Sequence, residues 1–155
     1  MNIHLNKISK TCLGRSLICE SLGAFALEDI EKDSYICEYL GEILTKEETD
    51  RRTLFNDLFG LNYLFSLNDL NDIDAYRIGN EMRYVNHSAY GYENCYARGI
   101  YSRGEKRIVL YAKRDILRGE ELFFDYQIQI NVPWLVKYNR QYGLSNQTGS
   151  TNFIQ

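Results

Sequence analysis

Several short stretches of the chain have the two-residue side-chain alternation that is typical of β-strands. The alternation is clearest in residues 34–39 (SYICEY), and Gly41 interrupts it before residues 42–44 resume the extended pattern. Further short strands, bounded by turn-forming residues, are predicted at 62–67, 73–75, 95–101 and 106–112. The last two segments predict a hairpin, because the sequence SRGE between them suits a turn.

One segment has the signals of an α-helix. Residues 45–55 (TKEETDRRTLF) begin with Thr45 and Glu48 in a capping-box spacing, and two Glu–Arg pairs four residues apart follow. We expect these charges to form a solvent-exposed face. A second, short amphipathic helix is predicted at 133–142, where a proline occupies the first turn. Many short strands with one or two short helices predict an α+β fold dominated by β-structure.

The composition is that of a globular chain, with 45% hydrophobic and 25% charged residues in 155 positions. This length predicts one domain with a substantial core. Thirteen Tyr and seven Phe stand against one Trp, an aromatic excess that favours β-rich packing and can line a slot with rings. The net charge of −3 argues against direct nucleic-acid binding and is compatible with a Lys/Arg-rich partner peptide.

The cysteines predict reduced, structural thiols. None of the four forms a C-x-x-C or C-x-C pair, and with two distant histidines no zinc pattern emerges, so no metal site is expected. The beginning of the sequence lacks the apolar run of a signal peptide, and no stretch approaches 18 apolar residues. We therefore expect no membrane association and a nuclear or cytosolic location.

The segment Asn86-His87-Ser88 has three interpretations. It can be a polar turn, and it also fits the N-x-[ST] pattern of a glycosylation acceptor. The expected intracellular location removes the second interpretation. The third is a functional motif, which depends on the rest of the chain.

The motifs EYLGEI, RYVNHS and GEELFFDY, in this order and spacing, resemble the SET domain of protein lysine methyltransferases. The resemblance covers residues 13–130, which leaves 1–12 as an N-terminal extension and 131–155 as a C-terminal segment. The stretches EETDRR and ELFFDYQ favour the Enhancer-of-zeste (Polycomb) branch over the Trithorax branch. The resemblance implies a SET (β-clip-like) fold of small curved sheets in which one segment threads under another as a pseudoknot.

The resemblance also implies roles for four aromatic residues. Tyr126 matches the catalytic tyrosine, with a structural strand-end tyrosine as the alternative. Tyr39 matches the channel tyrosine that hydrogen-bonds the target amine, and Phe65 matches another channel aromatic; core packing is the alternative for both. Phe124 matches the position that sets how many methyl groups are accepted.

A second set of positions matches the binding site for S-adenosylmethionine, whose product is S-adenosylhomocysteine. Leu22 and Gly23 match the glycine-rich turn that passes the cofactor, and Tyr126 adjoins it. Asn86 and His87 match the residues at its adenine end, so the resemblance selects the functional interpretation of Asn-His-Ser.

The chain departs from the family pattern in three places. Ser21 replaces the first glycine of the cofactor turn, and the loop after Ser88 is longer than usual. No cysteine-rich segment is present, so a zinc-bound lid is not expected. Trp134 and Tyr138 are instead candidates for an aromatic lid.

The residue types suit methyl transfer to an amine. A free lysine has a pKa near 10.4, so at pH 7 about one in a few thousand is neutral and nucleophilic. An aromatic, poorly hydrated channel favours the neutral amine and aligns it. Rings facing a cationic group add about 1–2 kcal/mol each when desolvated.

The predicted function is therefore transfer of methyl groups from S-adenosylmethionine to a protein lysine. We expect a histone tail as substrate, a nuclear location, and di- and trimethylated products. Partner subunits or a homodimer are compatible with the resemblance. The alternative is a catalytically silent SET module that binds a peptide or a partner protein.

Overall fold

The computed structural model describes residues 11–59, 61–88 and 92–126. The chain divides into two units, Met1–Asp125 and Tyr126–Gln155, and all elements below belong to the first. The predicted helix at 133–142, the candidate lid residues Trp134 and Tyr138, and the segment 131–155 lie outside the described residues. So does most of the predicted N-terminal extension, although its last two residues already belong to the first strand.

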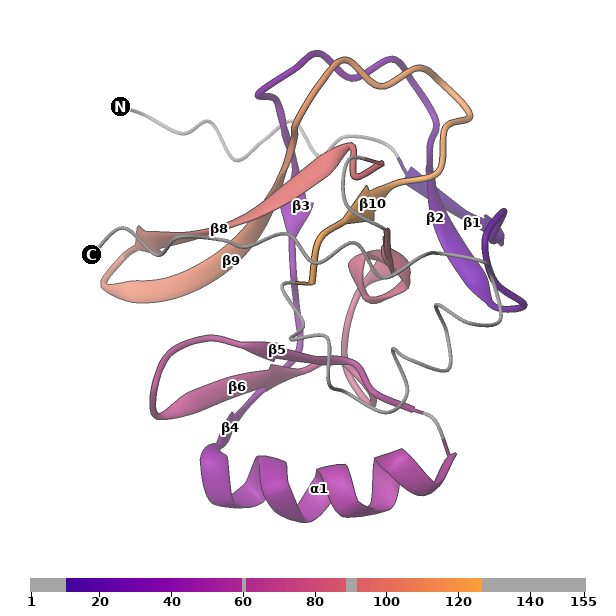
Figure 1. Ribbon diagram of the computed structural model, residues 1–155. Coiled ribbons are helices and arrows are strands. Elements are labelled where there is room, and N and C mark those ends of the chain that lie inside the picture. Colours follow the sequence, from indigo (N-terminus) through magenta and orange to yellow (C-terminus); the bar gives the residue numbers. More distant parts are fainter. Residues whose placement is uncertain (1–10, 60, 89–91, 127–155) are drawn as a thin grey trace, which may run out of the picture. The chain divides into compact units, whose positions relative to one another are not determined.

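Short strands dominate the described part of the chain, as the sequence predicts (Figure 1). The elements in order are β1 (Thr11–Arg15), β2 (Leu22–Ala26), β3 (Tyr35–Glu38), β4 (Glu42–Thr45), α1 (Lys46–Phe59), β5 (Leu64–Ser66), β6 (Asn71–Asp74), the 3-10 helix η1 (Glu81–Tyr84), β7 (Asn86–His87), β8 (Cys95–Ser102), β9 (Glu105–Ala112) and β10 (Phe123–Phe124).

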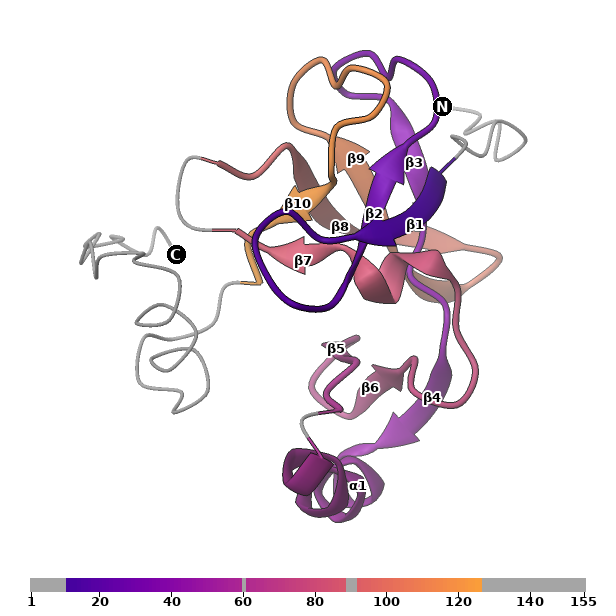
Figure 2. The same ribbon diagram turned by 90° about the vertical axis from the view of Figure 1, so that its right-hand side faces the viewer.

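The described strands form three small sheets. β1 pairs with β2, and β4, β6 and β5 form an antiparallel sheet of three strands. The largest sheet has the order β3-β9-β8-β10-β7. Its short strand β10 lies between β7 and β8 and is parallel to both (Figure 2). A late segment is thus inserted between two strands that are consecutive in the sequence, as the predicted threading requires.

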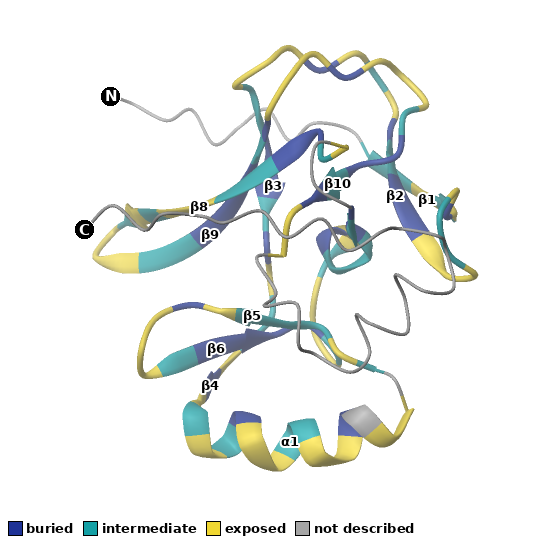
Figure 3. Cartoon of the chain, in the orientation of Figure 1, coloured by how far each residue is buried: buried dark blue, intermediate teal, exposed yellow. Residues whose placement is uncertain are grey.

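The hydrophobic core lies mainly along β2, β3 and β9 and continues through η1 (Figure 3). Ile36, Met82, Val85, Leu110 and Leu122 are among its fully buried side chains. Burial of a Leu or Ile side chain contributes about 1.5–3 kcal/mol each. The core therefore supplies the rigid support on which the neighbouring polar and aromatic side chains are held.

Helix α1 begins where the sequence predicts it. The Thr45 hydroxyl accepts a hydrogen bond from the Glu48 N–H at 3.3 Å. The expectation that its charges form a solvent-exposed face is wrong for Arg52, whose guanidinium bonds Glu42 at 2.9 Å and the fully buried Asp74 at 3.0 Å. These ion pairs attach α1 to β4 and β6.

Helix α1 also has exposed apolar side chains, and Figure 3 shows exposed positions along its length. It carries Leu54, Phe55, Leu58 and Phe59, which are all more than half exposed. The rings of Phe55 and Phe59 contact each other at a centroid distance of 4.9 Å. The helix therefore attaches to the sheet mainly through polar contacts.

Candidate active site

Three of the predicted channel aromatics lie in one row. The ring of Tyr39, which follows β3, is 5.3 Å from that of Phe65 on β5, and Phe65 stacks at 5.9 Å on Phe124 of β10. Tyr39 and Phe124 are buried, with 6% and 4% exposure. Residues that are distant in sequence thus form one continuous apolar wall.

The Tyr39 hydroxyl has a defined orientation in this row. It donates a hydrogen bond to the Tyr63 carbonyl at 2.8 Å. Burial, assisted by the negative charge of Asp74, raises the pKa of Tyr39 above its ordinary value of 10. The phenol therefore stays protonated at neutral pH, and its oxygen retains lone pairs that can accept a hydrogen bond from an amine.

Tyr126, the predicted catalytic tyrosine, follows Asp125 directly and is the first residue of the second unit. Its side chain is 36% exposed. Its catalytic role stays a prediction from the FFDY motif.

The predicted cofactor residues Leu22, Gly23 and Asn86 are brought together. The Asn86 Nδ2 group donates to the Leu22 carbonyl and to Glu121 Oε1, both at 3.1 Å. These two bonds use both amide hydrogens and determine which way the amide faces. Asn86 Oδ1 accepts no hydrogen bond from the described residues and is available to a ligand.

Glu121 is a central residue of this cluster that the sequence reasoning missed. Its carboxylate is 3% exposed and accepts hydrogen bonds from the Ser16 hydroxyl and the Leu17 N–H, each at 2.7 Å. Its sequence signal is its place in the GEELFFDY motif, as an acidic residue just before the apolar residues 122–124. That signal does not distinguish a buried carboxylate from an exposed one.

Asn94 is a second residue that the sequence reasoning missed. Its Nδ2 donates to the Glu121 carbonyl and its Oδ1 accepts from the Phe123 N–H, both at 2.8 Å, while the residue is 2% exposed. This buried amide holds the backbone that leads into β10. It thereby supports Phe124 in the aromatic row.

His87 lies on β7 beside Asn86, and its side chain is 14% exposed. Burial lowers the pKa of His87 below its ordinary value of 6.5, although Asp125, whose Oδ1 lies 4.0 Å from Nδ1, acts in the opposite direction. The imidazole is therefore neutral at pH 7. Its cofactor role stays a prediction.

Other features of the described residues lie outside this cluster. Cys37 and Cys95 are buried, and burial raises the pKa of each thiol to about 12. No group of three or more His, Cys, Asp or Glu in the described part of the chain could hold a metal ion. No helix among these residues is both long and apolar enough to cross a membrane.

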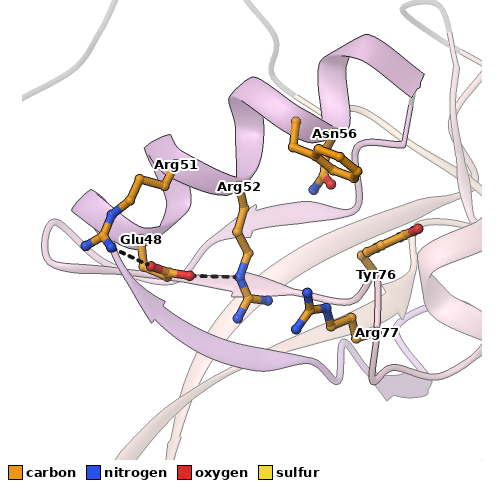
Figure 4. A pocket seen from close by; sticks show the side chains of 7 residues that line it. Glu48, Arg51, Arg52, Asn56, Tyr76 and Arg77 are labelled. Carbon is orange, nitrogen blue, oxygen red and sulfur yellow. Dashed lines mark hydrogen bonds and ion pairs between the residues drawn. The ribbon is translucent and has the colours of Figure 1, made fainter.

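A separate pocket lies between α1 and the segment after β6 (Figure 4). None of the predicted site residues lines it. Within it, the buried Asn56 Nδ2 has no hydrogen-bond partner among the described residues. The lining residues are Glu48, Arg51, Arg52, Phe55, Asn56, Tyr76 and Arg77.

Small sheets, a threaded strand and an aromatic row beside an Asn-anchored turn define a SET-type fold. A family model, the SET domain, matches residues 21–127, and the chain belongs to the SET domain family. The family prediction is therefore confirmed.

Curated relatives extend this assignment to the predicted branch. The chain is 44% identical over 126 residues to "Histone-lysine N-methyltransferase MEDEA" of Arabidopsis thaliana, which covers 81% of this chain and 18% of that protein. It is 38% identical over 129 residues to "Histone-lysine N-methyltransferase CLF" of the same plant, covering 83% and 14%. The chain thus spans less than a fifth of the length of these relatives.

Solved structures support the same family assignment. A chain of the Chaetomium thermophilum polycomb repressive complex 2 matches with a TM-score of 0.72 and 38% identity, over 82% of this chain and 16% of that one. Another chain of this complex, "in an autoinhibited conformation bound to S-adenosylmethionine", matches with a TM-score of 0.73 and 35% identity, over 86% and 17%. The predicted fold and the similarity to the Enhancer-of-zeste branch are confirmed.

Proposed function

We propose that this chain is the catalytic domain of a protein-lysine N-methyltransferase that modifies a histone tail. The observation that carries the proposal is the packed aromatic row of Tyr39, Phe65 and Phe124, with an oriented hydroxyl at one end. The names of the relatives, histone-lysine N-methyltransferases, support the same activity. A catalytically silent module would not need an oriented acceptor in an apolar wall.

The residues present fit S-adenosylmethionine. Asn86 Oδ1 is a half-buried acceptor that suits the exocyclic amine of the adenine ring, and the exposed side chain of Leu22 adds apolar surface beside it. The S-adenosylmethionine bound in a related structure supports this assignment. When bound, the cofactor supplies an electrophilic methyl group on a sulfonium centre.

The aromatic row acts on the lysine. Phe65 and Phe124 offer no polar atoms, so they strip water from the lysine side chain and favour its neutral amine. The protonated Tyr39 hydroxyl accepts a hydrogen bond from an amine N–H and restrains its rotation. The FFDY motif assigns the catalytic role in this proposal to Tyr126.

We also propose di- and trimethylation. Phe124 has no hydroxyl with which to hold an ordered water beside the target nitrogen, and its ring is packed against Phe65. Such a water would occupy the volume that each added methyl group needs.

Because polycomb repressive complex 2 is an assembly and the relatives are much longer, we propose that the activity depends on partner subunits in the nucleus, with a homodimer as the alternative.

Binding of S-adenosylmethionine by calorimetry, followed by transfer of a labelled methyl group to a histone panel, tests the proposal. We expect Tyr126→Phe to lower kcat at least about tenfold, equivalent to roughly 1.4 kcal/mol of barrier. The matched control is Tyr101→Phe, because Tyr101 lies on β8 with 78% exposure and should leave the rate unchanged.

Two results would contradict the assignment. Equal rates for Tyr126→Phe and the parent would show that this tyrosine is structural. Cofactor binding without transfer to any histone, with and without partner subunits, would favour the silent module.

A further inference from the structure

We infer that Glu121 is a positioning residue of the cofactor site. It fixes the conformation of the turn at residues 16–22, before Gly23, and the orientation of the Asn86 amide. The inference rests on the proposed function, because it assigns Glu121 a task toward S-adenosylmethionine. Glu121 itself is buried and does not have to touch the cofactor.

The Glu121 carboxylate joins two segments that are far apart in the sequence. Oε1 accepts from the Ser16 hydroxyl at 2.7 Å and from Asn86 Nδ2 at 3.1 Å, and Oε2 accepts from the Leu17 N–H at 2.7 Å. Hydrogen bonds to a charged group contribute about 1.5–3 kcal/mol each. One side chain therefore holds the loop after β1 against β7.

The backbone of Glu121 is held as firmly as its side chain. Its carbonyl accepts from Asn94 Nδ2 at 2.8 Å, and the residue bridges to Phe25 of β2. Gly23 leaves room for the carboxylate, since a Cβ there would lie 2.2 Å from Oε1. The carboxylate consequently occupies one defined place between the turn and β7.

This arrangement determines what Asn86 presents to a ligand. With Nδ2 facing the Glu121 carboxylate and the Leu22 carbonyl, Asn86 Oδ1 must face away from both. A flipped amide would place Oδ1 against a carboxylate oxygen, which is electrostatically unfavourable. Glu121 thus makes Asn86 an acceptor, the polarity that the exocyclic amine of the adenine ring requires.

A glutamine cannot replace this carboxylate, although it has nearly the same shape. Every partner of the Glu121 carboxylate is a donor, and an amide offers only one acceptor oxygen. In Glu121→Gln, an NH2 group must face either the Leu17 N–H or the Ser16 and Asn86 donors. The turn or the amide orientation is lost in each case.

Two measurements on Glu121→Gln test the inference. Hydrogen exchange in the absence of cofactor should be at least about tenfold faster in residues 17–22, because the anchored turn opens more often. Calorimetry and steady-state kinetics should give a Kd and a KM for S-adenosylmethionine that are at least about tenfold higher, with kcat at saturating cofactor within about threefold of the parent. The split between KM and kcat separates positioning of the cofactor from a general loss of folded protein.

Asp72→Asn is the matched control. Asp72 is also a buried carboxylate, at 6% exposure, and pairs with Lys46 at 2.5 Å. We expect this variant to lose stability and to retain the parent affinity for the cofactor. If Glu121→Gln does not fold, Ser16→Ala removes one donor and should change exchange and Kd in the same direction, about threefold.

The outcomes are distinguishable. Parent-like exchange and parent-like affinity in Glu121→Gln, or in Ser16→Ala when it is needed, would overturn the inference. An equal loss of affinity in Asp72→Asn would also overturn it, since the effect would then be general. A parent chain that binds no cofactor would refute the proposed function and, with it, the cofactor role of Glu121. The exchange measurement would still decide whether Glu121 holds the turn.

Discussion

Gly23 is a position at which one added methyl group should be costly. A Cβ atom there would lie 2.2 Å from Oε1 and 2.7 Å from Cδ of Glu121, where ordinary contact begins at 3.4 Å. The carboxylate cannot swing aside freely, because Ser16 and Leu17 hold its two oxygens at 2.7 Å each. Gly23→Ala must therefore displace either β2 or the anchored carboxylate.

The cost can be worked from these distances. Relief of the contact requires a shift of roughly 1 Å, which breaks at least one hydrogen bond to the carboxylate, worth about 1.5–3 kcal/mol. Overpacking adds about 1–3 kcal/mol. We therefore expect the free energy of unfolding to fall by about 2.5–6 kcal/mol, and Tm to fall by about 2–4 °C for each kcal/mol in a domain of this size.

Urea unfolding followed by circular dichroism measures this loss, and Gly99→Ala is the control. A Cβ at Gly99 would meet only the end of the flexible Lys106 side chain, with Cε at 3.0 Å, so we expect a midpoint close to that of the parent. If Gly23→Ala unfolds at the same urea concentration as Gly99→Ala, the carboxylate cluster is not rigid and the reasoning fails.

Three further predictions concern chemistry. Phe124→Tyr should shift products toward monomethyl-lysine without abolishing the first transfer; mass spectrometry after exhaustive reaction decides this, and a parent that stops at one methyl group contradicts it. Because burial raises the pKa of Cys37 and Cys95 to about 12, iodoacetamide at pH 8 should label at most two of the four thiols in the native protein and all four in urea. Because burial lowers the pKa of His87, the unfolded chain binds more protons at this residue than the folded chain does. Its contribution to stability should be present above pH 6.5 and lost as the pH falls through the lowered value. His87→Asn should reduce this pH dependence of the unfolding free energy in urea titrations at pH 5–7. An unchanged pH dependence would show that it does not come from His87.

Local patterns in the sequence predicted the local elements of the fold. The alternation in residues 34–39 corresponds to β3, and the predicted hairpin corresponds to β8 and β9, whose turn uses positive φ angles at Arg103 and Gly104. The capping signal placed the start of α1 correctly. These features depend on neighbours in the sequence, so the sequence displays them directly.

The alternation of hydrophobic and polar residues could not predict the contacts between residues that are far apart in the sequence. The strand β10 has only two residues, too few for a pattern, and its place between β7 and β8 came only from the resemblance. The burial of Arg52 and Glu121 depends on partners that are 22 and 105 residues away, respectively. A charged residue looks the same in sequence whether such a partner exists or not.

The place of β10 in the sheet also has a consequence for the order in which the chain folds. Phe123 and Phe124 pair with Asn86 and His87 on one side, and Phe124 pairs with Cys95 on the other. Contacts between such distant residues require a large loop to close and are expected to form late, after local hairpins such as β8–β9. Insertion of β10 brings Phe124 to the aromatic row. The same step brings Glu121 to Asn86 and to the turn at residues 16–22. We therefore expect the lysine channel and the cofactor site to form together. A folding intermediate with a complete β8–β9 hairpin but no inserted β10 would bind neither the lysine nor the cofactor.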